Sequence, residues 1–323
     1  MASRKYWMTL TAVWALAALA AFGLLAYANP MPFGTEKFWL IAQRRADAVV
    51  AMAVVAVAQA MATVAFQTVT NNRILTPSIM GFESLYRVIH TATIFFLGAA
   101  GLTASRTLGN FLLQMALMVG LSLLLYTWLL TDNSHNMHAM LLVGVVIGGG
   151  LGSLTAFMQR LLTPSEFDVL TARLFGSVNN AETDFYPVAI PIVVVATALL
   201  FINARRMNVI ALGPDVSRNL GVNHKFNAIY TLILVSILMA TSTALVGPMT
   251  FLGFLVATLA YMATDSYDHR LIFPMATGIG FLVLTSAYFI LRHVFDAQGV
   301  VSIIIELVGG SVFLLVILRK GRL

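Results

Sequence analysis

The chain alternates along its whole length between long apolar stretches and short polar ones. Eight of the apolar stretches are long enough to cross a bilayer as helices, because about 20 residues at a rise of about 1.5 Å span the hydrocarbon core. They are residues 7–28, 46–70, 109–131, 138–160, 185–204, 226–246, 271–292 and 302–318. Two more, residues 78–100 and 249–263, are interrupted by polar residues or glycine. The pattern predicts an all-α integral membrane protein of about ten transmembrane helices, with short or broken helices among them.

The polar connection at about 205–225 differs from the other loops. Gly213-Pro214 is typical of a helix start, because proline at the first helical position lacks an N–H group that would have no partner anyway. Leu220-Gly221 is typical of a helix end, since glycine adopts the left-handed conformation without steric cost. The helix between them has barely two turns, too few to be stable alone in water. Held between two membrane helices, it predicts a docking element for a second protein.

A second polar connection, residues 71–81, contains Pro77. Proline disfavours the helical conformation at the preceding residue, Thr76, so the chain is expected to turn there before the short stretch at 78–100. Broken helices of this kind are tolerated at membrane depth where they line a cavity.

Glycines gather in the stretch at 138–160. They are Gly144, Gly148, Gly149, Gly150 and Gly152. Small residues four apart allow a neighbouring helix to approach closely, and each glycine weakens a helix by about 1 kcal/mol relative to alanine. The sequence leaves two interpretations open: plain helix packing, or a helix that moves to gate a pathway.

Composition narrows the possible chemistry. The 323 residues are 59% hydrophobic and 10% charged, with no cysteine, which excludes disulfides, thiolate metal sites and cysteine nucleophiles. No lysine follows a glycine, so the phosphate-binding motif of nucleotide hydrolases is absent and any ATP must be bound by a partner subunit. His135 and His138 have only Asp132 nearby as a carboxylate, which predicts a polar loop rather than a metal site. No linker, low-complexity segment or clear repeat divides the chain, so residues 1–323 are expected to form a single transmembrane domain.

The positions of lysine and arginine along the chain predict how it is oriented in the membrane. Arg4-Lys5 followed by an apolar run and Ala-Tyr-Ala imitates a secretory signal, but the run is too long for a signal core and is interpreted as a retained first span. With the N-terminus inside, most lysine and arginine residues fall in cytoplasmic segments, as membrane proteins favour. We therefore expect a multi-pass membrane protein with both termini and the 205–225 loop in the cytosol.

The segment GPDVSRNLGV resembles the cytoplasmic coupling loop of FecCD-type permeases, the membrane subunits of iron-siderophore and cobalamin (type II) ABC importers. Pro214 and Ser217 depart from the family pattern. The matches are Gly213, Asp215, Arg218, Leu220, Gly221 and Val222 in this loop, Asn72, Pro77, Met80 and Gly81 before the short span, and Gly247-Pro248, Phe251, Gly253, Asp268-His269-Arg270 and Pro274 near the C-terminus.

The resemblance implies a place in the bacterial plasma (inner) membrane, and it also implies partners and roles for individual residues. The partners are a homologous or identical permease subunit, two ATP-binding subunits and an extracytoplasmic siderophore-binding protein, with no nucleic acid. ATPase coupling falls to Gly213, Asp215, Arg218, Leu220 and Gly221; docking of the binding protein to Arg44, Arg45 and Arg292; and the pathway and its gating to Gly148, Gly149, Gly150, Gly152 and Glu306. The motif SIIIELVGG around Glu306, together with Glu83, is similar to the subgroup that imports catecholate siderophores.

Several alternatives stay open. Arg45 could anchor a helix end, and Glu306 and Glu83 could be structural hydrogen-bonding groups, with Arg87 an expected partner for Glu83. If both carboxylates were proton relays, the chain would be a proton-coupled secondary transporter of a small organic solute. Cobalamin and haem are alternative cargoes. A membrane-embedded enzyme lacks a catalytic cluster.

Overall fold

The computed structural model describes residues 3–27, 29–104, 106–131, 137–178, 181–295 and 301–320. Within these ranges every regular element is a helix. The longer helices are α1 (Arg4–Ala26), α2 (Glu36–Val69), α3 (Phe82–Ala104), α4 (Leu108–Thr131), α5 (Met137–Gln159), α7 (Tyr186–Ile210), α9 (His224–Val246), α10 (Leu252–Ala263), α11 (His269–His293) and α12 (Val301–Lys320). The shorter ones are α6 (Pro164–Leu174), α8 (Pro214–Asn219) and the 3₁₀ turns η1 (Pro77–Met80) and η3 (Thr183–Phe185).

Each apolar stretch of the sequence forms a helix, as predicted. Six helices of the described chain are long and apolar enough to cross a membrane by length and composition: α1, α2, α5 over Leu142–Gln159, α7 with its preceding turn, α9 and α11. The predicted short and broken helices are confirmed as well. Helix α10 has 12 residues, about 18 Å, which is less than the hydrocarbon thickness, and α3 is interrupted at Gly98, whose φ is 69°.

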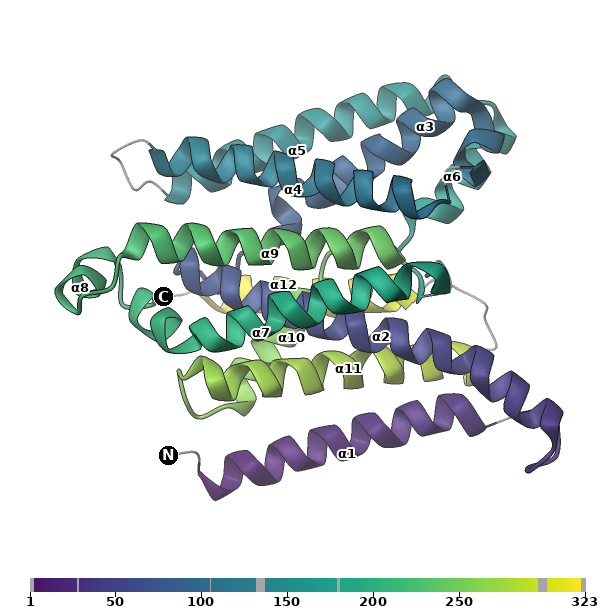
Figure 1. Ribbon diagram of the computed structural model, residues 1–323, viewed down its shortest axis with the longest axis horizontal. Helices are drawn as coiled ribbons and strands as arrows, with labels where there is room; N and C mark the ends of the chain where they lie inside the picture. The colour runs from purple at the N-terminus through teal and green to yellow at the C-terminus, as the bar shows by residue number, and fades with distance from the viewer. Residues whose placement is uncertain are drawn as a thin grey trace.

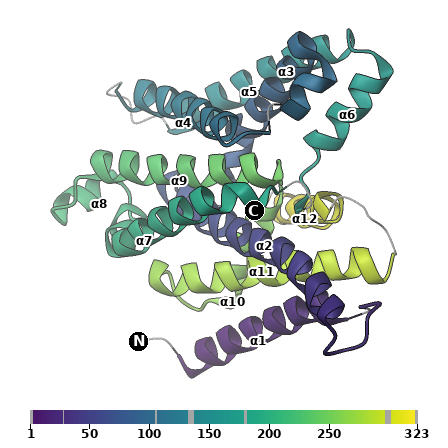
Figure 2. The same cartoon turned by 45° about the vertical axis from the view of Figure 1, so that its right-hand side comes forward.

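Helices α2 and α9 form the centre of the bundle. They pack against each other, and α9 also contacts α4 and α7. In the apolar part of α2 and of α9, 78% of the residues are buried, against 17% in α1, which therefore lies at the periphery. Figure 1 shows α1 along one edge beside α11, and α3, α4, α5 and α6 along the opposite edge. The turned view in Figure 2 shows the same separation of these two edges.

The two ends of the bundle carry different elements. The start of α1, the end of α12 and helix α8 lie towards one end, and α6 lies at the other (Figure 1). Because the chain starts and finishes at the same end of the bundle, the arrangement agrees with an even number of membrane crossings. The membrane side on which each end lies stays a prediction from charge placement.

Helix α6 was not predicted. Thr163 and Glu166 form a capping box, in which each side chain accepts from the backbone N–H of the other, and Pro164 occupies the first helical position. Leu170 is fully buried and packs with Ile94 of α3. The segment T-P-S-E at 163–166 is the signal that could have revealed this helix, because the capping box depends only on local sequence.

Candidate functional site

Helix α8 begins and ends where the sequence predicts. Gly213 caps its N-terminus with φ of 93°, a conformation that favours glycine, and Pro214 is the first helical residue. At the other end Gly221 has φ of 76°, and two backbone bonds close the helix: Val222 N–H to Ser217 O at 2.9 Å and Gly221 N–H to Arg218 O at 3.0 Å. This Schellman arrangement satisfies carbonyl groups that a helix end otherwise leaves without partners.

Ser217 fastens α8 to its neighbours. Its side chain is fully buried, and Oγ lies 2.6 Å from the carbonyl oxygen of Gly213 and 3.0 Å from that of Val209 in α7. Nδ1 of His224, the first residue of α9, lies 3.3 Å from the same Oγ. A six-residue helix is not stable by itself, so these contacts hold it in place between α7 and α9. Sequence reasoning treated Ser217 only as a departure from the family pattern and missed this role.

The opposite face of α8 is exposed. Its exposed side chains are those of Asp215, Val216, Arg218 and Leu220, and Leu220 is 59% exposed. Beside them Pro214, Arg218 and residues 221–225 line a shallow hollow of about 400 Å³. Exposed apolar side chains next to charged ones are typical of a surface that another protein covers. The five predicted coupling residues are therefore together on one small protrusion.

A partly buried polar junction lies near the end of α7, just before α8 in the chain. The Asn208 amide donates to Asp268 Oδ1 at 2.9 Å, and its carbonyl oxygen accepts the backbone N–H of His269 at 3.0 Å. Nε2 of His269 lies 2.6 Å from Oγ1 of Thr68. These contacts join the ends of α7, α11 and α2. The predicted motif Asp268-His269-Arg270 thus connects the base of the protrusion to the centre of the bundle.

Asp268 is held as a carboxylate at this junction. Burial alone raises the pKa of Asp268, but the hydrogen bonds from the Asn208 side chain and the Arg270 N–H outweigh it, leaving the pKa below its ordinary value of 3.8. The same carboxylate caps the N-terminus of α11, where the helix dipole favours negative charge.

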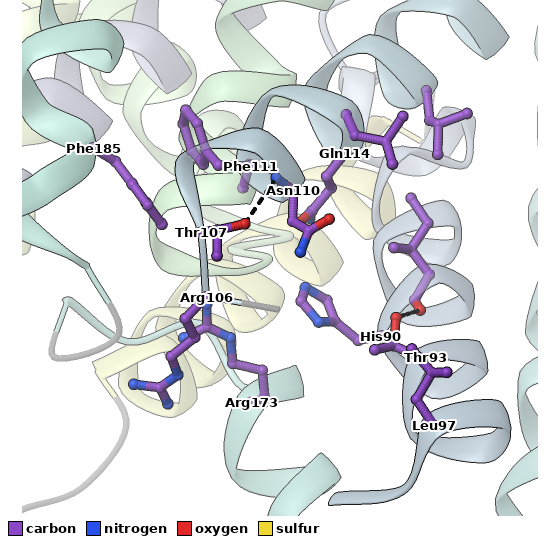
Figure 3. A pocket seen from close by; sticks show the side chains of 14 residues that line it. His90, Thr93, Leu97, Arg106, Thr107, Asn110, Phe111, Gln114, Arg173 and Phe185 are labelled. Carbon is purple, nitrogen blue, oxygen red and sulfur yellow. Dashed lines mark hydrogen bonds between the residues drawn. The ribbon is translucent and has the colours of Figure 1, made fainter. Parts of the chain in front are cut away.

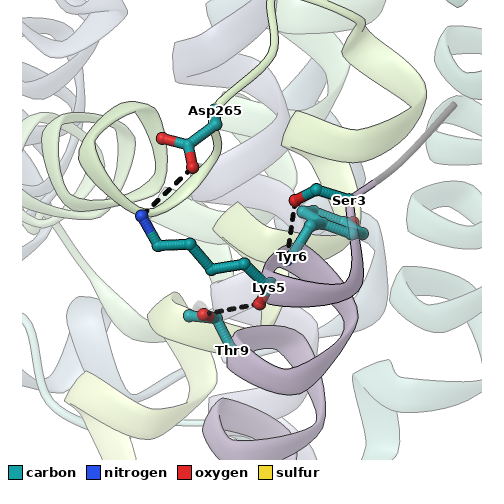
Figure 4. A network of polar contacts seen from close by, with 5 residues as sticks. All are labelled: Ser3, Lys5, Tyr6, Thr9 and Asp265. Carbon is teal, nitrogen blue, oxygen red and sulfur yellow. Dashed lines mark hydrogen bonds and ion pairs between the residues drawn. The ribbon is translucent and has the colours of Figure 1, made fainter.

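The first helix is attached to the same end. Lys5 Nζ lies 3.2 Å from Oδ2 of Asp265, in the connection between α10 and α11 (Figure 4). Tyr6 donates its hydroxyl hydrogen to the carbonyl oxygen of Leu271 at 2.9 Å. The guanidinium of Arg73 stacks over Tyr261, 4.5 Å from the ring centroid. The loops at the α8 end are therefore linked to one another by specific contacts.

The model of the FecCD transport family matches residues 5–319. The chain belongs to that family. The petrobactin import system permease protein FatC of Bacillus anthracis is 53% identical over 321 residues, which cover 99% of this chain and 91% of the relative. The permease protein YclO of a petrobactin import system in Bacillus subtilis (strain 168) is 36% identical, over 86% of this chain and 89% of the relative.

A solved structure supports the fold. A metal-chelate type ABC transporter in an inward-facing conformation aligns with a TM-score of 0.80 and 20% identity, covering 97% of this chain and 99% of the other. The resemblance inferred from the sequence is therefore confirmed. The chain is a multi-pass membrane transport subunit with the FecCD fold.

Of the three predicted docking arginines of this FecCD chain, Arg45 is buried. Its guanidinium donates from Nη1 to the carbonyl oxygens of Tyr27 at 2.9 Å and Leu24 at 3.3 Å, at the end of α1. This geometry favours the helix-anchor interpretation of Arg45. Arg44 and Arg292 are exposed at the bundle end opposite α8, and their role in docking a binding protein stays a prediction.

The predicted pathway glycines on α5 divide into two groups. A Cβ at Gly148 would lie 3.5 Å from Cα of Gly81, an ordinary van der Waals distance, so this position packs α5 against the turn between η1 and α3. At Gly149, Gly150 and Gly152 a Cβ would meet nothing within 4 Å. Packing accounts for Gly148, while the other three leave an open strip along α5; their role in gating stays a prediction.

Glu83 has a different partner from the expected one. Its carboxylate is buried at the start of α3 and accepts the hydroxyl hydrogen of Thr250 at 2.6 Å, whereas no ion pair with Arg87 is found in the described part of the chain. Thr250 lies 167 residues away in the loop before α10, a contact that helix periodicity cannot predict. Glu306 is half-buried on α12. His135 and the side chain of His138 lie outside the described residues.

Proposed function

We propose that this chain is the permease subunit of an ATP-driven importer that carries a ferric siderophore of the catecholate type. Helix α8 carries the proposal. One of its faces is exposed and the other is fixed by hydrogen bonds of Ser217, as a docking site for a second protein requires. The cargo is inferred from relatives, since FatC and YclO both belong to petrobactin import systems by name.

ATP hydrolysis comes from two separate ATP-binding subunits that dock on α8. When ATP binding draws these subunits together, α8 moves with them. Ser217 transmits that movement to α7 and α9, and the junction at Asn208 transmits it to α2 and α11. The helices around the open strip of α5 then change the cavity from outward to inward access.

The second permease in the complex is a different polypeptide. Two Bacillus anthracis proteins are named as permeases of the petrobactin import system, FatC at 53% identity and FatD at 25% identity to this chain. Because one system has two permeases and this chain is far closer to one of them, a FatD-like chain is the expected partner. Helix α8 faces the cytosol in this assembly, and Arg44 and Arg292 face an extracytoplasmic siderophore-binding protein, paired with its carboxylates.

Reconstitution tests the proposal. The chain is co-expressed with a FatD-like permease and the ATPase and placed in proteoliposomes, with the binding protein and an iron-loaded catecholate siderophore outside. Uptake that requires ATP and stops when the ATPase is omitted supports it. Uptake driven by a proton gradient without nucleotide would indicate the secondary transporter with Glu83 and Glu306 as relays. ATP-dependent uptake that prefers cobalamin or haem would refute the proposed siderophore cargo but not the ATP-driven mechanism.

A further inference from the structure

Helix α3 starts in the middle of the bundle rather than at one of its ends. Gly81, the residue before α3, lies against Gly148, which is near the middle of the membrane-spanning helix α5. From there α3 and α5 both run towards the end that carries α6 (Figure 1). Arg87 follows Gly81 by six residues, about 9 Å along a helix, so it lies inside a hydrocarbon layer that is about 30 Å thick.

The Arg87 side chain is exposed at this depth. Its guanidinium makes no ion pair within the part of the chain that the structure describes. On the peripheral helix α1, by contrast, the exposed side chains of its second half include Leu16, Leu19 and Phe22, which suit contact with lipid. A charged side chain among lipid tails is strongly disfavoured, and such residues face the interior of an assembly or a water-filled cavity instead. Arg87 therefore faces water or polar groups.

A loop connects this part of α3 to α12. One turn before Arg87, Glu83 accepts the hydroxyl hydrogen of Thr250 at 2.6 Å. The next residue, Phe251, packs on α12, where a Cβ added at Gly309 would lie 2.7 Å from Cβ of Phe251. The start of α3 and the middle of α12 are therefore held near each other at membrane depth.

Helix α12 carries a carboxylate in the same region. Glu306 lies one turn before Gly309 and is half-buried. The guanidinium of Arg87 is close enough for its charge to act on Glu306 as well as on Glu83, although no ion pair joins them in the described part of the chain. Two helices thus carry opposite charges that are near each other but not in contact.

A small cavity beside α3 is separate from this charge pair. Figure 3 shows His90, three residues after Arg87, lining that cavity together with Asn110 and Gln114 of α4. Its volume is about 160 Å³, and neither Arg87 nor Glu306 is among its lining residues. The polar surroundings that Arg87 requires therefore lie elsewhere, on the exposed surface between α3 and α12.

We propose that Arg87 and Glu306 line the water-filled passage of the cargo, as opposite charges on two of its walls, α3 and α12. The proposal rests on the importer function above for what moves through the passage, and it adds Arg87 to the residues that line it. A guanidinium and a carboxylate attract each other strongly where little water separates them. The pair therefore draws α3 and α12 together when the passage closes and separates when it opens.

Thiol labelling tests the position of Arg87. The chain has no cysteine, so an introduced thiol is unique within it. Arg87→Cys is assembled with the other subunits in lipid nanodiscs and treated with a membrane-impermeant cationic methanethiosulfonate, and labelling of this chain is followed by mass spectrometry. Leu19→Cys is the matched control, because Leu19 is exposed in the second half of α1. We expect Arg87→Cys to react about tenfold faster or more, since the reacting species is the thiolate, which forms in water and not among lipid tails. Equally slow labelling of both variants would overturn the proposal.

Reagents of opposite charge test the pairing. A cationic methanethiosulfonate restores a positive charge to Arg87→Cys, whereas an anionic one of similar size adds a negative charge beside Glu306. We expect Arg87→Cys to lower ATP-driven uptake about fivefold, as for the loss of one partly exposed ion pair. The cationic reagent should restore most of the uptake and the anionic one should lower it further. Both reagents act on the folded complex, so a folding defect does not explain a difference between them. Equal responses to the two reagents would refute the charge pairing.

Failure of the importer function and failure of this inference are distinguishable. Labelling needs no transport, so its rate is measured whether or not the natural chain takes up a siderophore. Fast labelling of Arg87→Cys without any ATP-driven uptake by the natural chain would refute the importer alone. ATP-driven uptake by the natural chain with slow labelling of Arg87→Cys would refute the position of Arg87 in the passage alone.

Discussion

Asn208 and His269 meet across 61 residues of sequence, with the Asn208 side-chain oxygen 3.0 Å from the backbone nitrogen of His269. The ring nitrogen Nε2 of the same histidine lies within hydrogen-bond distance of the Thr68 hydroxyl. Asn208 is on α7, a few residues before α8, and Thr68 is at the end of the central helix α2. Hydrogen bonds therefore connect the end of α7, just before α8, to the central helix, and we expect a displacement of α8 to be carried along them.

Asn208→Leu is expected to uncouple the transporter. The change keeps the approximate volume, but it leaves the His269 N–H without its acceptor and removes one of the hydrogen bonds to the Asp268 carboxylate, at a cost of about 1–3 kcal/mol. Uptake per ATP hydrolysed should fall while ATPase activity persists, measured in proteoliposomes. Thr197→Val on the same helix is the control, because it removes only contacts of the Thr197 hydroxyl with two carbonyl groups of α7 itself. Unchanged coupling in Asn208→Leu would rule out a role for the junction.

The lowered pKa of Asp268 predicts that the stability of the folded protein depends on pH. Its pKa is lower in the folded protein than in the unfolded chain, so its charge stabilises the fold above about pH 4 and the stabilisation is lost as pH falls through the folded pKa. Asp268→Asn keeps an N-cap but removes the charge. The melting temperature of the natural chain should exceed that of the variant at neutral pH, and the two should converge in acid. A gap that stays constant with pH would contradict this.

Gly221 is expected to tolerate asparagine better than alanine. Its φ of 76° costs an alanine about 1–2 kcal/mol, whereas asparagine visits this region more readily. Gly221→Ala should therefore loosen the end of α8, increase proteolysis in the 205–225 loop and lower uptake per ATP, with Gly221→Asn between it and the natural chain. The reverse order of the two variants would show that backbone conformation is not the reason for this glycine.

Gly176 and Gly149 should respond oppositely to alanine. At Gly176 a Cβ would lie 2.1 Å from the carbonyl oxygen of Pro248, a backbone atom that cannot move aside cheaply, and overpacking typically costs about 1–3 kcal/mol. At Gly149 a Cβ meets nothing within 4 Å, and alanine should stabilise the helix by up to about 1 kcal/mol. Thermal unfolding of both variants measures the difference. If Gly149→Ala unfolds normally but blocks uptake, the gating role of the α5 strip is supported.

The exposed Arg292 and the buried Arg45, both at the bundle end opposite α8, should differ in function. Arg292→Glu is expected to weaken the affinity of the binding protein, and more strongly at low salt, because exposed charges are screened. Arg45→Met should lower the melting temperature instead, since the α1 carbonyl groups lose their donor. Surface binding measurements at two salt concentrations and thermal unfolding distinguish them. A loss of affinity in Arg45→Met at unchanged stability would restore Arg45 as a docking residue.

Local features could be predicted from the sequence because their causes lie within a few residues. The apolar stretches gave the helices, Pro214 and Gly221 gave the bounds of α8, and Pro77 gave the extended residue before η1. The capping box of α6 was equally local and could have been found in the same way. The matched motifs gave the family, since they occur at separate places along the chain.

The sequence alone determined which apolar segments form helices and where α8 begins and ends, and it lacks the phosphate-binding motif of nucleotide hydrolases. Only the tertiary structure decided that Arg45 caps α1, that Glu83 bonds to Thr250 and that Ser217 anchors α8. Helix propensity, proline and glycine act through neighbouring backbone atoms, so they can be read along the chain. The partner of a buried polar group is set by whichever helix packs beside it, and that depends on the arrangement of the whole bundle.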